Sequence, residues 1–471
     1  MKLSEWELAR LETVAQALAP LQEKVVFLGG SIVGLLLTDP ASPLYALVES
    51  LFETVKGVWE DLFERRYGFW RGILDGVVAR YLDCGIFERG FARIRCPDCA
   101  TEFLLAFSCK GRGLCPSCGA KRAAEFAAFL QDEVVADVGH AQWVFTVPKL
   151  LRPYFMHHRE LLGPLCNAAW QSVRELMAVA AGEENGFRPG MVAMSQTFGD
   201  QLNVHPHVHA LVTRGGWTAS GEWVGVPYVS TSAAEQLFRH KVMSLLQRAG
   251  LLDEDRTRLL LSWHHSGFSV HNTVTVPAGD GRALEALARY CLRNPVSLAR
   301  LRWEPGSETA TYLPQAGHDG EQAKTLDALD FVARLLAHVP DPRRHLVHYY
   351  GAYSNVVRGK LKAHNQALQA ESLASGPGVH PPPPPACASP SSAAFRRGWA
   401  RLLRRVYETD PLVCPRCQGV MRVVAFITEG RVIRRILDHL GASILDHLGA
   451  SAFRAPQDRA PPLSAAVSVS L

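Results

Sequence analysis

Three histidines alternate with other residues in the segment His205–His209, which reads HPHVH. Side chains on a strand point to opposite faces in turn, so a regular strand places all three imidazoles on one face. Imidazole nitrogens are frequent metal ligands, and this triplet indicates a metal site. The proline lacks a backbone donor and belongs at a strand's start or edge. We therefore expect His207 and His209 to be the primary ligands, with His205 or Gln196 as a third and Asp200 as a weaker option.

Tyrosines cluster at Tyr349, Tyr350 and Tyr353. If this segment is helical, Tyr349 and Tyr353 share a face, whereas Tyr350 lies on another. Two such phenols could act in turn on DNA phosphodiesters, each forming a phosphotyrosine and freeing a 3′ hydroxyl. Phenol, with an ordinary pKa of about 10, is a weak nucleophile near neutral pH, so a cation that polarises the phosphate would assist it. Gly351 weakens the expected helix.

Cysteines form a cluster of two Cys-x-x-Cys pairs, Cys96/Cys99 and Cys115/Cys118, with fifteen residues between the pairs. Tetrahedral zinc takes four such ligands, and each pair supplies two from one tight turn. We expect these four to bind one zinc ion. Cys109, between the pairs, could replace one of them or be buried.

A third Cys-x-x-Cys pair, Cys414 and Cys417, stands alone near the C-terminal end. One pair gives two of the four ligands that zinc requires, so the prediction of zinc here is weaker. Cys387 and His439 are distant candidates for the missing ligands.

Basic residues gather in two stretches although the whole chain carries a net charge of only +5. Residues 89–122 contain seven Lys or Arg and two acids, and residues 395–435 contain ten Arg and three acids. Such stretches either contact DNA phosphates or form a solvated face. The residues expected to contact DNA are Lys110, Arg112, Lys121 and Arg122, and, around the tyrosines, Arg343, Arg344, Arg358 and Lys360.

Composition is that of a globular protein, with 48% hydrophobic and 20% charged residues. The longest apolar run, Val25–Leu37, is shorter than the roughly 20 residues that span a bilayer. A charged start after Met1 does not resemble a signal peptide. Cysteines in Cys-x-x-Cys pairs indicate metal ligands rather than disulfides. We expect a cytoplasmic protein that binds DNA and no membrane.

The length of 471 residues allows several domains, which composition delimits. Residues 1–43 are an atypical start, 44–135 a helical and zinc-binding segment, and 136–363 an α+β segment. A proline-rich linker occupies 364–394, and a basic helical module with the third cysteine pair occupies 395–471. Strands are expected at Gln142–Val147, Met191–Phe198, His205–Thr213 and Gly267–Val276, and helices at Leu161–Ala181, Ser232–Ala249, Arg282–Arg293, Thr325–His338 and Phe395–Val406.

Two features depart from this organisation. The octapeptide ILDHLGAS at Ile436–Ser443 is repeated at Ile444–Ser451, which indicates a local tandem duplication. Phe27–Gly34 faintly resembles the opening of a nucleotidyltransferase fold. No closely spaced acids follow it to bind a metal, so we expect no such activity and interpret residues 1–43 as a fusion.

Taken together, these motifs resemble a known family. The pair His207 and His209 resembles the histidine–hydrophobe–histidine motif of HUH endonucleases, and Tyr349 with Tyr353 resembles their two-tyrosine branch. The order of parts is similar to bacterial rolling-circle insertion-sequence transposases of the IS91 kind, which carry an N-terminal zinc-binding domain. The similarity runs from about Pro43 to Gly441, and its other motifs are Phe107–Gly113, Gln196–Asp200, Ser266–His271 and Tyr353–Asn355.

The resemblance implies an α+β fold: a ferredoxin-like antiparallel sheet with the histidines on a central strand and the tyrosines on a nearby helix. It implies nicking of single-stranded DNA at element ends through a 5′ phosphotyrosine, and strand transfer by rolling-circle transposition. It also implies catalytic magnesium or manganese beside structural zinc. Some relatives keep only the tyrosine that matches Tyr349, so Tyr349 ranks first, Tyr353 second and Tyr350 last.

Two alternatives stay open on sequence. One is an HUH enzyme with another role, such as a replication initiator or relaxase. The other is a non-enzymatic, zinc-dependent DNA-binding protein, which would form no covalent adduct with DNA. The zinc-binding segment and flanking motifs favour the transposase.

Overall fold

A computed structural model describes residues 42–183, 186–263, 265–314, 323–360, 414 and 416–440. The predictions for residues 1–41, the proline-rich linker, the helix Phe395–Val406 and the second octapeptide copy lie outside these residues. No helix among those described has the length and apolar character needed to cross a membrane.

The largest element of the fold is an antiparallel sheet in the order β12-β4-β5-β3-β7, with β6 paired to β5 and β8 to β3. The histidine segment lies on the central strand, as expected. The α+β class predicted from sequence is confirmed. The strands are β3 (His140–Thr146), β4 (Arg188–Phe198), β5 (Val204–Trp217), β6 (Trp223–Gly225), β7 (Ser269–His271), β8 (Thr275–Val276) and β12 (Val347–Gly351).

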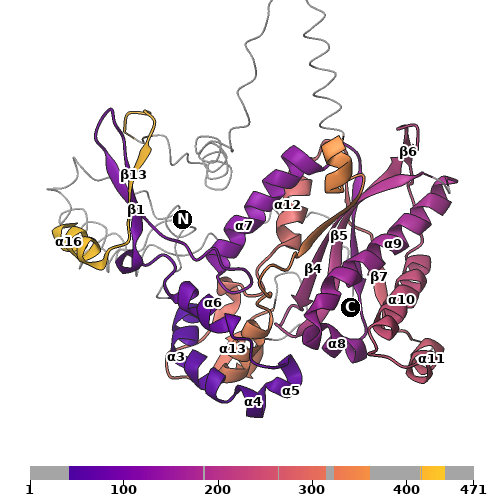
Figure 1. The fold of residues 1–471 in the computed structure, drawn as a ribbon, viewed down its shortest axis with the longest axis horizontal. Coiled ribbons are helices and arrows are strands. Elements are labelled where there is room, and N and C mark those ends of the chain that lie inside the picture. Colours follow the sequence, from indigo (N-terminus) through magenta and orange to yellow (C-terminus); the bar gives the residue numbers. More distant parts are fainter. Residues whose placement is uncertain are drawn as a thin grey trace, which may run out of the picture.

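Helices cover both faces of this sheet (Figure 1). On one face, α9 (Leu162–Ala181) and α10 (Thr231–Arg248) pack on Val208, Ala210 and Val212 of β5. On the other, α7 (Pro116–Phe129) and α12 (Gly281–Cys291) pack on Leu211. The alternation of β5 thus buries apolar side chains on both faces. Shorter helices at the rim are η3 (Leu130–Val134), η4 (Lys149–Leu151), α8 (Arg152–His157), η5 (Arg159–Leu161) and α11 (Glu254–Ser262).

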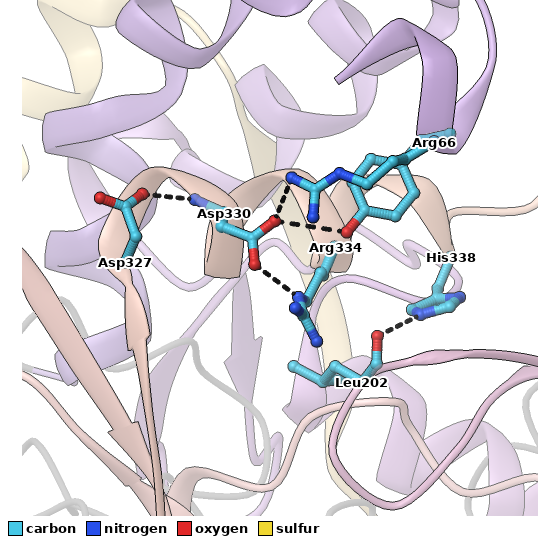
Figure 2. A network of polar contacts seen from close by, with 7 residues as sticks. Arg66, Leu202, Asp327, Asp330, Arg334 and His338 are labelled. Atoms are coloured by element: carbon cyan, nitrogen blue, oxygen red, sulfur yellow. Dashed lines mark hydrogen bonds and ion pairs between the residues drawn. The ribbon is translucent and has the colours of Figure 1, made fainter. Parts of the chain in front are cut away.

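A helical module packs beside the sheet through α13 (Ala328–Ala337). It contains α3 (Pro43–Gly57), α4 (Trp59–Leu62), α5 (Glu64–Tyr67) and α6 (Ile73–Leu82). Asp327 caps α13, and the Asp330 carboxylate accepts hydrogen bonds from Arg66 and Arg334 (Figure 2). At the far end, His338 Nε2 lies 3.0 Å from the Leu202 carbonyl, just before β5. The module is therefore fastened to the strand that carries the histidines.

Two small sheets complete the fold. One has the order β11-β10-β9, and the other has the order β13-β1-β2, which joins the C-terminal segment to the cysteine-rich segment. In Figure 1, β13 and α16 lie beside β1, although more than 300 residues separate the strands in sequence. The strands of these two sheets are β1 (Phe91–Arg95), β2 (Glu102–Ala106), β9 (Leu301–Arg302), β10 (Thr309–Tyr312), β11 (Lys324–Asp327) and β13 (Arg422–Ile427). The helices next to them in sequence are η2 (Phe87–Arg89), η6 (Leu298–Arg300) and α16 (Gly430–Leu440).

Candidate metal and nucleophile site

The histidine strand presents two imidazoles side by side. His207 and His209 are 6% and 3% exposed, and their Nε2 atoms lie 3.0 Å apart. Two nitrogens at about 2.1 Å from one cation and at right angles to each other are also about 3.0 Å apart. The pair therefore has the spacing of two ligands of one ion. His205 shares this face, is half-buried, and its ring centroid lies 4.9 Å from that of His207.

Hydrogen bonds fix which nitrogens of these rings carry protons. His207 Nδ1 donates to the His205 carbonyl at 2.6 Å, which leaves its Nε2 as an acceptor. Gln142 Nε2 donates to His209 Nδ1 at 3.0 Å, so His209 Nε2 carries the proton and donates to His207. If the Gln142 amide turned over, its oxygen would accept from Nδ1 and free both Nε2 lone pairs for a cation.

Burial keeps these imidazoles neutral. Removal from water lowers the pKa of His209 to about 3 and that of His205 to about 4, and it lowers the pKa of His207 well below its ordinary value. Neutral rings retain the lone pair that a metal ligand needs. The site can therefore offer nitrogen ligands across the physiological pH range.

Gln196 is the third residue at this position of the sheet. It lies on β4 directly opposite His207, on the same face. Its Nε2 donates to the Cys291 carbonyl at 2.7 Å, whereas its buried Oε1 has no hydrogen-bond partner among the described residues. A buried acceptor without a partner is costly, and a cation beside His207 would satisfy it.

The tyrosines do not lie on one helix, so that prediction is wrong. Tyr349 and Tyr350 belong to the edge strand β12, where Tyr349 pairs with Val192 of β4. Gly351 ends the strand with a φ of 59°, and a Cβ there would meet the Pro189 carbonyl oxygen. Only glycine adopts this conformation so close to another backbone. The chain therefore turns before Tyr353.

Tyr349 lies on the same face of the sheet as the histidines. Its ring packs edge-on against Phe129, and the Arg358 guanidinium lies 5.3 Å from the ring centroid. Burial raises the pKa of Tyr349, and Arg358 opposes this rise. The Tyr349 hydroxyl makes no hydrogen bond to any residue that the structure describes.

Tyr350 and Tyr353 have structural surroundings. Tyr350 points to the opposite face and stacks on Trp170 at 5.5 Å. Tyr353 is 2% exposed, and its hydroxyl lies 2.6 Å from His140 Nε2 and accepts from the Ala136 N–H. His140 pairs with Thr213 of β5. Thr213 is four residues from His209 on the same strand, which places their Cα atoms about 13 Å apart.

The strand pairing sets the distance from Tyr349 to the histidines. Its partner Val192 pairs with Leu211, two residues from His209. Two strand spacings and two residue rises separate Tyr349 from His209, which places their Cα atoms about 12 Å apart. No contact joins their side chains within the described residues. Buried Val192 and Leu211 lie between them on this face of the sheet.

The cysteines form two separate clusters rather than the one predicted. Cys115 and Cys118 meet Cys109 and Cys84, whereas Cys96 and Cys99 meet Cys414 and Cys417. In the first cluster, sulfur–sulfur distances are 3.5 to 3.9 Å. A ZnS4 tetrahedron with bonds of about 2.3 Å has edges of about 3.8 Å. The expectation that Cys96, Cys99, Cys115 and Cys118 share one ion is wrong, because each pair meets cysteines from elsewhere in the chain instead of the other pair.

Sequence reasoning missed Cys84 as a member of the first cluster. It follows α6 as an isolated cysteine, without the Cys-x-x-Cys signal. Its sulfur accepts a hydrogen bond from the Cys109 backbone at 3.2 Å. Reasoning from sequence also left Cys414 and Cys417 without partners, because their partner pair lies more than 300 residues away.

The basic residues expected to bind DNA fall into three groups. Arg112, Arg122, Arg343 and Arg344 line one cavity of about 310 Å3, which Gln196 also lines. Arg358 lies on Tyr349. The remaining three are outside the cavity wall: Lys110 and Lys360 are exposed and Lys121 is partly buried.

Comparisons with known proteins identify the same two parts of the chain. Residues 190–360 match the family model described as "Putative transposase", and residues 55–147 match "Transposase zinc-binding domain". The chain is 27% identical to "Transposase for insertion sequence element IS801" of Pseudomonas savastanoi pv. phaseolicola, over 82% of this chain and 92% of that one. It is 24% identical to "Putative transposase y4qJ" of Sinorhizobium fredii, over 56% and 70% respectively. No solved structure matches the chain.

Proposed function

The chain is an IS91-like transposase with a zinc-binding domain, and from this premise we propose that it nicks single-stranded DNA with Tyr349. The observation that carries the proposal is the pair His207 and His209. Their Nε2 atoms lie 3.0 Å apart on the same sheet face as Tyr349. We expect the protein to act in the bacterial cytoplasm, on DNA at the element ends and at the target.

The proposed step is an in-line displacement at phosphorus. Tyr349 Oη forms a bond to the scissile phosphorus, and the bond from phosphorus to the 3′ oxygen breaks. The phenol proton passes to solvent, and the departing oxygen takes up a proton to become a 3′ hydroxyl. The DNA 5′ phosphate stays on Tyr349. Attack by another 3′ hydroxyl reverses the step and joins a new strand, which is the chemistry that rolling-circle transposition requires.

The residues that would hold a catalytic cation are His207, His209 and Gln196. Nitrogen ligands alone favour later transition metals, whereas an amide oxygen suits magnesium or manganese. The buried, unpartnered Oε1 of Gln196 fits this donor set. When bound, the cation would polarise the scissile phosphate. His205 is close enough to the pair to orient it, since its carbonyl fixes the His207 tautomer.

Arg358 has a role at the nucleophile. Its guanidinium stays near the Tyr349 ring because Nη1 donates to the Glu133 carbonyl and Nη2 to Asn355. A positive charge there stabilises the phenolate form and therefore favours attack. We assign Tyr353 no chemical step, because its hydroxyl is already hydrogen-bonded to His140.

The zinc-binding domain would supply DNA contact and stability. The cluster of Cys84, Cys109, Cys115 and Cys118 caps the start of α7, whose other end reaches Phe129 beside Tyr349. Zinc in this cluster would fix the helix that covers the nuclease face. The cluster therefore couples the zinc domain to the nucleophile.

The experiment incubates the protein with labelled single-stranded DNA that carries an element end, in the presence of manganese. We expect an adduct that survives denaturant and depends on Tyr349, His207 and His209. If the Tyr349→Phe protein still forms the adduct, the nucleophile assignment is wrong. If the wild-type protein binds the DNA and forms no adduct under any divalent metal, the non-enzymatic alternative is correct. An initiator or relaxase would instead nick a replication or transfer origin and leave element ends intact.

A further inference from the structure

We infer that Cys96, Cys99, Cys414 and Cys417 form a second zinc site, which fastens the C-terminal segment of the chain onto the N-terminal zinc-binding domain. Their sulfur atoms all lie within 4.8 Å of one another. Cys96 Sγ is 3.5 Å from Cys417 Sγ, and Cys99 Sγ is 3.5 Å from Cys414 Sγ. These distances are close to the edge of about 3.8 Å in a ZnS4 tetrahedron.

The two cysteine pairs adopt the same turn. The Cys96 N–H donates to the Thr101 carbonyl, and the Ala100 N–H donates to the Cys96 carbonyl. In the other pair, the Cys414 N–H donates to Gly419 and the Gln418 N–H to Cys414. The donor and acceptor positions are identical in the two turns.

Backbone conformation supports this equivalence. Ala100 and Gln418 hold the same position in their turns, with φ of 58° and 60°. Residues other than glycine seldom adopt this left-handed conformation, which costs energy. Gly419 comes so close to the Asp98 carboxylate that a Cβ there would clash. Two matching turns that face each other are the arrangement of a zinc ribbon, in which each turn gives two thiolates.

Packing around the cluster joins the same two segments. Strand β13 pairs with β1 from Phe91↔Ile427 to Arg95↔Arg422. Beneath the sulfurs, Ile94 and Met421 are 0% and 2% exposed. The helix α16 buries Ile433 and Leu437 against Phe91. These clusters are small, and a small core commonly needs a metal to be stable.

Zinc would bind here as four thiols lose their protons, giving a site with a net charge of −2. The zinc-binding family model ends at residue 147 and the second model at 360, so neither includes Cys414 or Cys417. The structure thereby completes the zinc-binding domain with a segment from the other end of the chain.

Metal content of the purified full chain tests this inference. We expect two zinc ions per chain in the wild-type protein and one in the Cys414→Ser/Cys417→Ser protein. The Cys96→Ser/Cys99→Ser protein should also hold one, and the quadruple variant should still hold one. Each double variant would then lose one zinc ion, and the quadruple variant would lose no more than that. Such non-additive losses would show that the four cysteines share one ion.

Controls keep the test independent of folding. Cys166→Ala, at a buried cysteine outside both clusters, should retain two zinc ions. In cobalt-substituted protein, the thiolate-to-cobalt absorption should fall by half in each double variant. One zinc per wild-type chain, or two in the Cys414→Ser/Cys417→Ser protein, would overturn the inference.

A second inference rests on a different feature, the arginine-lined cavity between α7, the end of β4 and the loop before β12. We propose that it holds the DNA backbone phosphate next to the scissile one, so this inference rests on the proposed function. Six arginines line the cavity, namely Arg112, Arg122, Arg159, Arg293, Arg343 and Arg344. The two acids in its wall are Glu160 and Asp341, and Asp341 is paired with Arg71.

Unsatisfied polar atoms and a strained residue mark the same cavity. Ser195 Oγ and His348 Nε2 are buried, have no hydrogen-bond partner within the described ranges, and belong to residues that line it. Arg343 has a φ of 60°, and its exposed side chain is in no hydrogen bond or ion pair of the described residues. Gln196 also places the cavity beside the proposed metal site.

Binding of a short labelled single-stranded oligonucleotide tests this second inference. It is measured with chelator in a Tyr349→Phe background, so that cleavage does not contribute. Arg343→Ala/Arg344→Ala should weaken binding at least 10-fold and reduce the slope of log affinity against log salt by up to roughly 1.4. The matched control, Arg256→Ala/Arg258→Ala on α11, should leave both unchanged.

The outcomes separate this inference from the proposed function. Unchanged affinity in the Arg343→Ala/Arg344→Ala protein would overturn the cavity assignment and leave the adduct chemistry intact. Weakened binding together with a wild-type protein that never forms an adduct would overturn the nucleophile and retain the cavity.

Discussion

The strand that carries the histidines and the strand that carries Tyr349 differ in how firmly each is held. Strand β5 lies at the centre of the sheet and pairs along most of its length with β3 and β4. Strand β12 lies at the edge and pairs with β4 alone. His207 and His209 are buried with every Nδ1 engaged, whereas Tyr349 is half-buried and its hydroxyl is free of hydrogen bonds among the described residues.

This difference predicts separate roles for the two strands, cation binding for β5 and nucleophilic attack for β12. A cation site needs ligands held within a fraction of an ångström, and a central strand provides that rigidity. A nucleophile that attacks and later leaves needs room to move, and an edge strand provides it. We expect changes at β5 to act on metal binding and changes at β12 to act on the chemical step.

The largest expected effect comes from removing a metal ligand. His207→Ala and His209→Ala should each lower adduct formation by at least roughly 100-fold, because the scissile phosphate loses its polarising cation. Labelled DNA retained on denaturing gels measures this. The control His240→Ala, on the exposed side of α10, should match wild type. Equal activity of His209→Ala and His240→Ala would refute the metal role.

The next effect separates the two tyrosines. Tyr353→Phe should lower the free energy of unfolding by about 1–3 kcal/mol, because it leaves buried His140 Nε2 without its partner. It should still form the adduct. Tyr349→Phe should keep wild-type stability and form no adduct. Urea unfolding and adduct gels on both proteins decide this, and the reverse pattern would show that Tyr353 is the nucleophile.

A smaller effect is expected at Gln142. Gln142→Leu removes the partner of His209 Nδ1 and should weaken manganese binding by roughly 10- to 100-fold. Isothermal titration with manganese measures this. Gln142→Glu, whose carboxylate would accept from Nδ1–H as the turned-over amide does, should retain most of the affinity. If the leucine variant binds manganese as wild type does, Gln142 does not orient the ligand.

Arg358 should set the pH dependence of the chemical step. It holds the pKa of Tyr349 below the value that burial alone would give. Arg358→Ala should therefore raise that pKa, and the rate of adduct formation should begin to rise at a higher pH. Arg358→Lys keeps the charge and should shift the profile less. A profile unmoved by the alanine substitution would exclude this electrostatic role.

The last effect concerns stability in acid and not adduct formation. Burial lowers the pKa of His140 and of His338 to about 4 from 6.5. Below pH 6.5 the unfolded chain binds protons that the folded chain does not, so stability should fall as pH drops from 6.5 to 4. Thermal unfolding across this range measures the loss. A melting temperature that is constant or rises towards pH 4 would contradict it.

Sequence predicted the parts of the fold that depend on local pattern. The alternation in His205–His209 predicted the strand and its face, and the family resemblance implied its central place. The helix predicted at Leu161–Ala181 begins within one residue of α9. The zinc ligands were recognised as cysteines, but their grouping depends on which turns meet in space. Cys84 and the pair Cys414/Cys417 join their clusters through tertiary contacts that spacing does not encode.

The tyrosine segment shows why the rest of the site could not be predicted. A spacing of four residues predicts one helix face only if the backbone is helical throughout. Gly351 adopts a left-handed conformation under the Pro189 carbonyl, and the pairing of β12 with β4 outweighs local helix propensity. The sequence therefore identified the nucleophile candidates and misjudged their geometry.

The central claim is that Tyr349, across the sheet face from His207 and His209, becomes attached to DNA. Protease digestion of the adduct, followed by mass spectrometry of the nucleotide-bearing peptide, identifies the attached residue. We predict a phosphodiester on Tyr349 and none on Tyr350 or Tyr353. Attachment to Tyr350, which faces away from the histidines, or to a residue outside 349–353 would contradict it.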